Sequence, residues 1–263
     1  MSNENEYGRF CLEPLKSEVQ VSLFNRVSIS GYVVLEGNSG SGKTTLANNL
    51  EKRPGFVHIG EYGNYLDFKN GENFPNFPPK NINDVLNSNS LWPQIEIRRR
   101  SHQIEFAEKY PNSVQIVERS LLSLLAFEYA KKEQGVVFDI QNLTDIYSEL
   151  YKKGILVEPS AYVFLKASPE IIRERVKDKK DSSSLRFLSS SKSVIVINEF
   201  IQEFLEKYVP KENYLIIDSG KIKSEDIIEK VVAFIEKLEN PIKPNDSLVS
   251  FIYNVKTGRT SMF

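Results

Sequence analysis

The sequence predicts an α/β fold, in which a mostly parallel sheet is flanked by helices on both faces. Short apolar runs of strand length alternate along the chain with longer stretches that have helical periodicity. A glycine-rich segment follows the first apolar run directly and precedes the first helical stretch. Because consecutive parallel strands need a crossover connection, this alternation predicts right-handed βαβ units.

Five apolar runs are the expected strands of this sheet. Residues 31–36 contain two consecutive valines and lead into a glycine-rich segment, which is typical of a buried strand. The four later runs are short and rich in β-branched, leucine or aromatic residues. In chain order the expected strands are residues 31–36, 56–59, 114–117, 161–165 and 214–217.

Two helices are expected in the first half of the chain. Residues 44–52 place two leucines four positions apart, on one helical face. Residues 91–110 have helical periodicity, with Pro93 acceptable in a first turn and Pro111 as a stop. Residues 60–90 are rich in asparagine, glycine and proline and are expected to form a long loop.

The second half of the chain shows clearer helix boundaries. Ser168, Pro169 and Glu170 match an N-cap, a first-turn proline and an acid near the positive helix end. Residues 178–193 are charged and serine-rich, so a surface loop is expected there. The helices expected in this half are a segment beginning near Leu121 and residues 141–153, 169–177, 194–208 and 224–238.

These elements divide the chain into one main domain and two extensions. The main domain is expected to span residues 31–238. Residues 1–30 are expected to form an N-terminal extension with one short element around residues 19–23. Residues 239–263 are expected to form a C-terminal tail whose apolar residues either pack back on the domain or serve a partner interface.

The composition excludes several classes of protein. The 263 residues include 34 basic and 35 acidic side chains, which argues against a nucleic-acid polymer or an anionic membrane as partner. Cys11 is the only cysteine, and His58 and His102 have no metal-ligand spacing, so neither a disulfide framework nor a histidine metal site is expected. No signal pattern or membrane-length apolar run is present, so we expect a cytoplasmic protein.

Residues 37–44 carry the strongest functional signal. Their sequence GNSGSGKT matches the phosphate-loop pattern G-x-x-x-x-G-K-[ST], with a strand before it and a helix after it. The glycines allow backbone N–H groups to converge on phosphate oxygens. Lys43 would neutralise the β- and γ-phosphates, and the Thr44 hydroxyl would bind Mg²⁺. The residues expected to bind the nucleotide are Gly37, Asn38, Ser39, Gly40, Ser41, Gly42, Lys43, Thr44 and Thr45.

Two acids follow strands at the edge of the sheet where the phosphate loop is expected. The third strand leads into Glu118, which could hold Mg²⁺, and Arg119, which could bridge the transferring phosphoryl group. Glu61 follows the second strand and could accept a proton from an attacking hydroxyl. The alternatives are a surface ion pair at residues 118 and 119 and a solvated loop residue at position 61.

Other features narrow the class of nucleotide-binding protein. The chain has no guanine-reading N-K-x-D motif and no strand that ends in the adjacent acids Asp-Glu, which argues against a GTPase and against an ABC or AAA motor. Residues 173–180 are strongly basic and include Arg175 and Lys179. They could form a lid that brings positive charge to the phosphates, or they could be a solvated helix end.

These residues resemble the deoxyribonucleoside kinase and thymidylate kinase family of P-loop kinases over residues 31–238. The triplet E-R-S at residues 118–120 is more typical of the deoxynucleoside kinase branch. The resemblance implies the P-loop kinase fold, with a five-stranded parallel sheet flanked by helices. It also implies ATP as phosphoryl donor, Mg²⁺ as cofactor, and a nucleoside or nucleotide substrate. Members of this family are often dimers, so a homodimer is a candidate assembly.

The resemblance also implies roles for individual residues. Glu61 looks like the family's general base for the 5′-hydroxyl, and Arg119 looks like the arginine that contacts this base and the phosphoryl group. Glu118 looks like the acid on the magnesium side. Arg175 and Lys179 look like lid residues.

Family members read the base with a glutamine and an arginine from the helix before the third strand. Gln94 and Arg99 are the candidates here, although residues 98–100 also fit a solvated arginine face with one inward residue. Four aromatic residues could stack on a base or serve ordinary packing. They are Tyr62, Tyr65, Phe68 and Trp92, and we include Tyr65 among the candidate substrate-binding residues.

The sequence also departs from the family pattern. No proline stands beside Glu61, Leu124 replaces an acid that often follows the triplet, and the lid has lysines where arginines are usual. Our leading hypothesis is an ATP- and Mg²⁺-dependent kinase that phosphorylates the 5′-hydroxyl of a (deoxy)nucleoside, with Glu61 as general base. One alternative is a nucleoside monophosphate kinase of the thymidylate type. The other is a nucleotide-binding regulator with weak or no catalysis.

Overall fold

The structure is a computed structural model that describes residues 32–67, 75–179, 182–238 and 247–260. The expected extension at residues 1–30, with its short element at residues 19–23, lies outside the described residues. So do Cys11 and Phe68.

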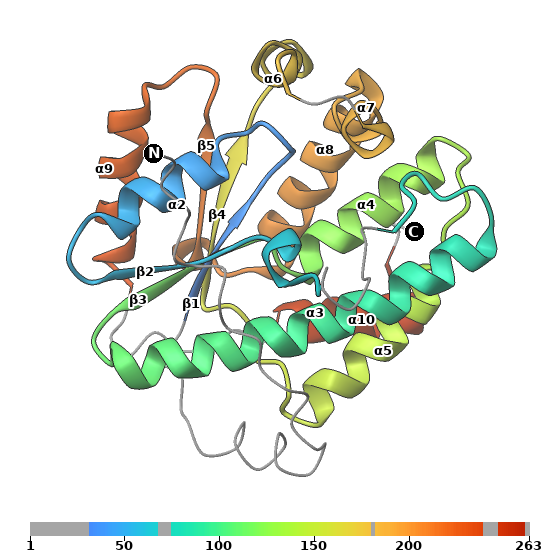
Figure 1. The fold of residues 1–263 in the computed structure, drawn as a ribbon, viewed down its shortest axis with the longest axis horizontal. Coiled ribbons are helices and arrows are strands. Elements are labelled where there is room, and N and C mark those ends of the chain that lie inside the picture. The colour runs from blue at the N-terminus through green and yellow to red at the C-terminus, as the bar shows by residue number, and fades with distance from the viewer. Residues whose placement is uncertain (1–31, 68–74, 180–181, 239–246, 261–263) are drawn as a thin grey trace.

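Five parallel strands form one sheet in the order β2-β3-β1-β4-β5, which confirms the predicted α/β fold (Figure 1). Leu35 of β1 pairs with Glu118 of β3 on one side and with Val163 of β4 on the other. The chain that leaves β1 therefore emerges at the centre of the carboxyl edge, where open α/β sheets bind ligands. The strands are β1 (Tyr32–Glu36), β2 (Phe56–Ile59), β3 (Val114–Glu118), β4 (Ala161–Lys166) and β5 (Tyr214–Asp218).

Side chains alternate across β1 because successive residues of a strand point to opposite faces. Val33 and Leu35 belong to the core beneath α2 (Lys43–Glu51) and α9 (Ser224–Ile235). Val34 belongs to the larger core on the opposite face. That core includes residues of α4 (Leu121–Glu133), α5 (Ile140–Lys152) and α8 (Ser191–Tyr208). Figure 1 shows α2 and α9 on one side of the sheet and α4 and α8 on the other.

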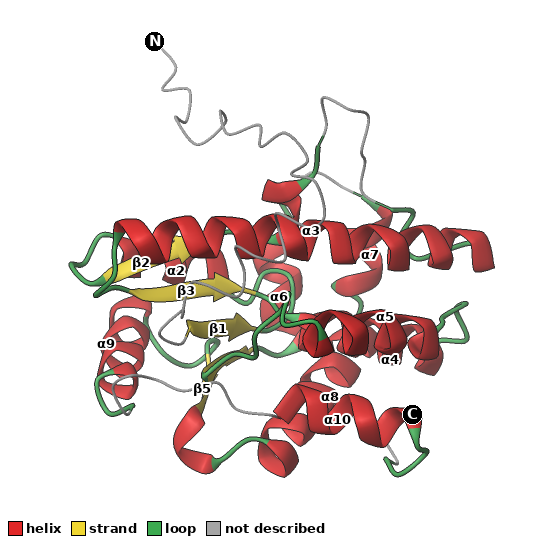
Figure 2. Ribbon diagram, turned by 90° about the horizontal axis from the view of Figure 1, so that it is seen from below, coloured by secondary structure: helices red, strands yellow, loops and turns green. Residues whose placement is uncertain are grey.

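The helix before β3 is longer than predicted. We expected residues 91–110, but α3 spans Ile82–Lys109, and Figure 2 shows it running alongside β2 and β3. Asn81 caps the helix by accepting a hydrogen bond from the Asp84 N–H at 3.1 Å. Pro93 therefore lies inside the helix and not in its first turn. Six of the eight residues 83–90 are polar, which hid this extension. Buried Asn89 stabilises it by hydrogen bonds to the Asp139 carbonyl and to the Asn142 side chain near the start of α5.

Two further helical segments occupy regions predicted as loops. The turn η2 (Tyr62–Tyr65) follows β2. In the expected loop 178–193, α7 spans Ser183–Leu188, and α8 begins at Ser191 instead of residue 194. Ser182 and Ser190 accept hydrogen bonds from backbone N–H groups at the starts of these two helices. Two of the serines that indicated a loop are therefore helix N-caps.

The described part of the C-terminal tail packs back on the domain. Helix α10 (Ser247–Lys256) contacts α5 and α8, and its Phe251 ring is fully buried against Phe200 and Phe204. Glu158 accepts hydrogen bonds from the N–H groups of Leu248 and Val249 at the start of this helix. The remaining elements are α6 (Pro169–Val176) and η4 (Lys211–Asn213). Among the helices that the structure describes, none combines the length and apolarity that crossing a membrane requires.

Candidate active site

The phosphate loop connects β1 to α2 and has the backbone that its glycines allow. Gly37 has φ +138°, and a Cβ there would lie 2.5 Å from the Leu165 carbonyl oxygen. Gly42 has φ +104° and is the N-cap of α2. The loop therefore passes close to β4 and turns directly into the helix, which directs the first N–H groups of α2 at the site.

Lys43 is buried beneath this loop. Its Nζ donates hydrogen bonds to the carbonyls of Gly37 at 2.8 Å and Asn38 at 2.9 Å. Burial, together with the nearby charge of Arg119, lowers the pKa of Lys43 to about 7. The amine is therefore poised to gain a proton when negative charge approaches it.

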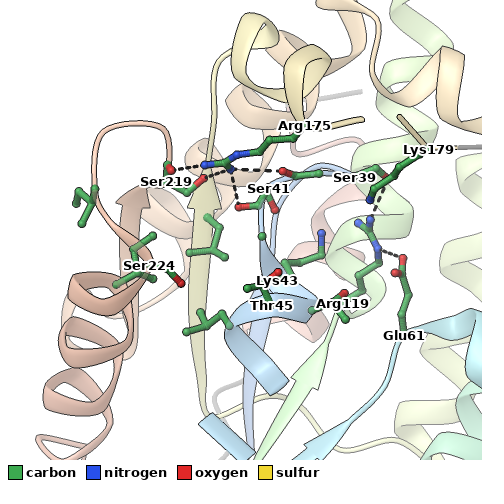
Figure 3. A pocket seen from close by; sticks show the side chains of 17 residues that line it. Ser39, Ser41, Lys43, Thr45, Glu61, Arg119, Arg175, Lys179, Ser219 and Ser224 are labelled. Atoms are coloured by element: carbon green, nitrogen blue, oxygen red, sulfur yellow. Dashed lines mark hydrogen bonds and ion pairs between the residues drawn. The ribbon is translucent and has the colours of Figure 1, made fainter. Parts of the chain in front are cut away.

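A cavity of about 430 Å³ opens above the loop (Figure 3). Seven consecutive residues, 39 to 45, line one wall, and Glu61 and Arg119 line another. Eleven of the predicted site residues thus line this one cavity. The remaining lining residues are Leu46, Leu165, Arg175, Lys179, Ser219, Ile222, Ser224 and Ile227.

Arg175 of α6 joins the phosphate loop to the segment after β5. Its guanidinium donates to the Ser41 carbonyl at 3.2 Å, to Ser219 Oγ at 3.1 Å and to the Ser219 carbonyl at 2.6 Å. The sequence analysis did not identify Ser219 or Ile222. Their position near the site could have been predicted from the sequence, because they follow the fifth strand at the edge of the sheet that carries the loop.

Glu61 and Arg119 form an ion pair on one wall of the cavity (Figure 3). Arg119 also donates to the Gly37 carbonyl at 3.0 Å and to Ser39 Oγ at 3.3 Å. The positive charges of Arg119 and, to a smaller extent, Lys43 lower the pKa of Glu61 to about 2, although partial burial opposes them. Glu61 is therefore ionised at neutral pH and faces the phosphate loop.

Thr44 and Glu118 meet beside the cavity. The Thr44 hydroxyl donates to Glu118 Oε2 at 2.7 Å, and His58 Nε2 lies 2.9 Å from Glu118 Oε1. No cluster of three or more His, Cys, Asp or Glu side chains that could hold a metal occurs in the described parts of the chain. A hydroxyl and one buried carboxylate nevertheless fit Mg²⁺, because this ion is commonly held by one or two carboxylates together with substrate phosphates and water.

Glu36 is a buried acid that the sequence analysis missed. It accepts hydrogen bonds from the Ser120 N–H at 3.0 Å, from Ser120 Oγ at 2.6 Å and from Ser123 Oγ. Burial raises the pKa of Glu36 above its ordinary value, while these hydrogen bonds act in the opposite direction. Its signal was an acid at the end of a buried strand, directly before the phosphate loop.

The structure does not bring every candidate into the cavity. Gln94 is exposed on α3, and its amide donates to the Ser90 carbonyl at 3.1 Å. The Tyr65 hydroxyl lies 2.7 Å from His102 Nδ1. The Asn38 side chain donates to Asn198 Oδ1 at 2.9 Å and so ties the loop to α8 instead of facing the cavity.

Arg99 also lies outside the cavity lining. Only 3% of this residue is exposed, and its Nη2 donates to the carbonyls of Glu118 at 3.2 Å and Arg119 at 2.8 Å. The Tyr62 ring, 4.6 Å from the guanidinium carbon, packs against Trp92 at a centroid distance of 5.5 Å. Neither aromatic ring lines the cavity.

Comparison with known proteins gives one family and a set of similar folds. The deoxynucleoside kinase family model matches residues 33–238. Two of the most similar solved structures are of deoxyadenosine kinase from M. mycoides, one with the products dCMP and a flexible dCDP bound and one with dATP bound. Both have a TM-score of 0.51, with 16% and 18% sequence identity, and cover 79% and 78% of this chain and 100% of their own. No curated protein sequence matches.

Proposed function

Because the chain belongs to the deoxynucleoside kinase family and is a phosphotransferase, we propose that it transfers the γ-phosphoryl group of ATP to the 5′-hydroxyl of a (deoxy)nucleoside, with Mg²⁺ as cofactor. The catalytic domain would span residues 31–238. The observation that carries this proposal is the convergence of Glu61, Arg119 and the phosphate loop on one cavity. A carboxylate opposite a phosphate site is the group that an attacking hydroxyl requires.

The donor would lie along the loop. Backbone N–H groups of residues 39 to 45 would bind the phosphate oxygens, and Lys43 would neutralise charge on the β- and γ-phosphates. Arg175 and Lys179 line the same cavity from the α6 side. They would add positive charge over the donor phosphates, as lid residues.

Thr44 and Glu118 would hold the magnesium ion. When bound there, the ion would supply positive charge that offsets the negative charge of the phosphates. The Thr44 hydroxyl and the Glu118 carboxylate are already in contact at 2.7 Å, so two hard oxygen ligands are available at the mouth of the loop.

Glu61 would orient the attacking hydroxyl and receive its proton. A carboxylate with a pKa of about 2 is a weak base, so the proton would move only once the new bond to phosphorus is largely formed. Arg119 would shift part of its interaction from Glu61 to the phosphoryl group as charge develops there. That shift would raise the pKa of Glu61 at the moment when the carboxylate must accept the proton.

The test is release of ADP from ATP by the full chain, measured with a panel of nucleosides and a panel of nucleoside monophosphates. Glu61→Gln is compared with Glu51→Gln, a control at an exposed position on α2. We expect turnover of nucleosides that is lost in Glu61→Gln and kept in Glu51→Gln.

Other outcomes would support the alternatives. Turnover of monophosphates alone would overturn the proposal in favour of a thymidylate-type kinase. Tight ATP binding without turnover of either panel would favour a nucleotide-binding regulator. Assembly as a homodimer and a cytoplasmic location stay predictions from the sequence.

A further inference from the structure

Arg119 has a backbone conformation that side chains rarely adopt. Its φ is +65°, and it is the only non-glycine residue with positive φ in the described parts of the chain. An arginine in the left-handed region is strained and persists only where the surrounding structure holds it. Two points therefore need an explanation: why the chain takes this conformation at residue 119, and which group maintains it.

The reason lies in the direction of two consecutive side chains. Side chains alternate between the faces of a strand, so Glu118 and Arg119 would point apart in a regular extension of β3. Instead, Glu118 contacts Thr44, and Arg119 contacts Glu61 and the Gly37 carbonyl. The left-handed turn at residue 119 brings both side chains to the phosphate loop.

Arg99 contacts the backbone of this turn. Its Nη2 donates to both carbonyls of the turn, those of Glu118 and Arg119. On its other side, Nη1 lies 3.4 Å from Glu96 Oε2, and Glu96 Oε1 accepts a hydrogen bond from the Tyr62 hydroxyl at 2.9 Å. Tyr62 follows Glu61 directly in the chain, so this network connects the segments that carry Glu61 and Arg119.

We propose that Arg99 is a positioning residue that fixes Arg119 in its left-handed conformation, and not a residue that reads the nucleobase. The proposal rests on the phosphoryl-transfer function given above. Arg99 acts through the backbone, because its guanidinium donates to the carbonyls of residues 118 and 119, while the Arg119 side chain faces the cavity. Loss of Arg99 would misplace both Glu118 and Arg119 relative to the phosphates.

Arg100 provides a matched control. It is the next residue of α3 and is also 3% exposed. In both residues, the Nε and Nη1 atoms have no hydrogen-bond partner among the residues that the structure describes, so the two differ in the bonds that Arg99 Nη2 makes to the turn. Arg99→Met and Arg100→Met thus remove the same buried charged group from the same helix, but only the first removes the bonds to the turn.

The experiment is steady-state kinetics of the full chain with ATP and a nucleoside that the wild type phosphorylates. We expect Arg99→Met to lower kcat about 100-fold, because a misplacement of about 1 Å has an effect of this size. The KM values for ATP and the nucleoside are expected to stay close to those of the wild type, and Arg100→Met is expected to keep most of kcat. Millimolar guanidinium should restore part of kcat to Arg99→Ala, whereas neutral urea should not.

Three results would overturn the proposal. They are equal losses of kcat in the two methionine variants, a higher nucleoside KM with unchanged kcat in Arg99→Met, and a left-handed Arg119 retained in a crystal structure of Arg99→Met. The crystal structure does not depend on turnover. If the wild type phosphorylates no nucleoside, the proposed function fails, and the φ of Arg119 in the two methionine variants still decides the role of Arg99.

Discussion

The two walls of the cavity are built in different ways. The donor wall is one continuous segment, residues 39 to 45, and its shape comes from a glycine-dependent backbone. The opposite wall consists of Glu61 after β2 and Arg119 after β3, with Arg99 of α3 behind them. Its bonds join residues 58 positions apart between Glu61 and Arg119 and 82 positions apart between Gly37 and Arg119.

This difference predicts different sensitivities to substitution. A wall of backbone N–H groups depends on few side chains, so a change there has a large effect only at a charged group or at a glycine with positive φ. A wall of paired ionised side chains depends on each partner, because loss of Glu61 would leave the charge of buried Arg119 without its counterpart.

Lys43 is the one charged side chain of the donor wall, so its loss should have the largest effect. Lys43→Met is expected to lower kcat about 1,000-fold, because a preorganised charge on the transferring group is lost. Lys52→Met, at an exposed position just after α2, should leave kcat unchanged. A loss of less than tenfold in Lys43→Met would show that the backbone alone supports transfer.

Arg119 tests the opposite wall. Arg119→Met is expected to lower kcat about 100-fold. It should also raise the pKa of Glu61 from about 2 toward the ordinary value of a glutamate, because the charge of Arg119 is the main cause of the lowered value. The pKa is measured by ¹³C NMR of the glutamate carboxyl groups, with the Glu61 signal assigned by its absence in Glu61→Gln. A Glu61 pKa that stays near 2 would contradict the assigned coupling.

Lys43 also links nucleotide binding to pH. Its pKa is lowered to about 7, and bound phosphates should raise it. Binding should therefore take up close to one proton at about pH 8, where the free amine is mostly neutral, and far less at about pH 6. Calorimetry in two buffers with different ionisation enthalpies measures this uptake. Lys43→Met provides the subtraction for the protons of the nucleotide itself, and equal uptake in both proteins would refute the link.

Gly40 tests the backbone of the donor wall. Its φ is +86°, and a Cβ there would lie 2.8 Å from Val176 Cγ1. Gly40→Ala is expected to weaken ATP binding by about 1–2 kcal/mol, measured as Kd. Gly55 has φ +87° with no atom near its Cβ position, so Gly55→Ala introduces the same strain away from the site. Equal Kd values for the two variants would show that the loop adapts to a side chain.

Gln94 should have the smallest effect, because it is exposed and contacts its own helix. Gln94→Ala is expected to leave the nucleoside KM within about twofold, the result for a surface substitution without specific contacts. A large increase in KM would place Gln94 in the acceptor site. It would contradict the structure, in which the Gln94 side chain is exposed on α3.

The features of the site that follow from local sequence patterns could be predicted from the sequence. The five strands, the phosphate loop and the convergence of Glu61 with Arg119 follow from local patterns and from the rule that parallel strands share a carboxyl edge. The positions of Lys43 and Thr44 in the site could be predicted because the whole phosphate-loop motif is one continuous segment. These features need no knowledge of how distant helices pack.

Features that depend on helix rotation and tertiary packing were harder to predict. Gln94 and Arg99 are five positions apart, which places them about 140° apart around a helix, so they cannot both face one site. Arg99 turns inward because its guanidinium pairs with the Glu96 carboxylate and donates hydrogen bonds to backbone carbonyls at the end of β3. The start of α3 at Ile82 and the role of Glu36 likewise depend on partners from elsewhere in the chain, namely α5 and the serines at the start of α4.

The reaction proposed for this cavity is transfer of a phosphoryl group from ATP to the 5′-hydroxyl of a nucleoside. ³¹P NMR of the product made by the full chain with ATP, Mg²⁺ and a nucleoside tests it most directly. We expect a new phosphomonoester signal coupled to the two 5′ protons of the sugar, and we expect Glu61→Gln not to produce it. A product formed only from monophosphates, with the phosphorus–phosphorus coupling of a diphosphate, would contradict it.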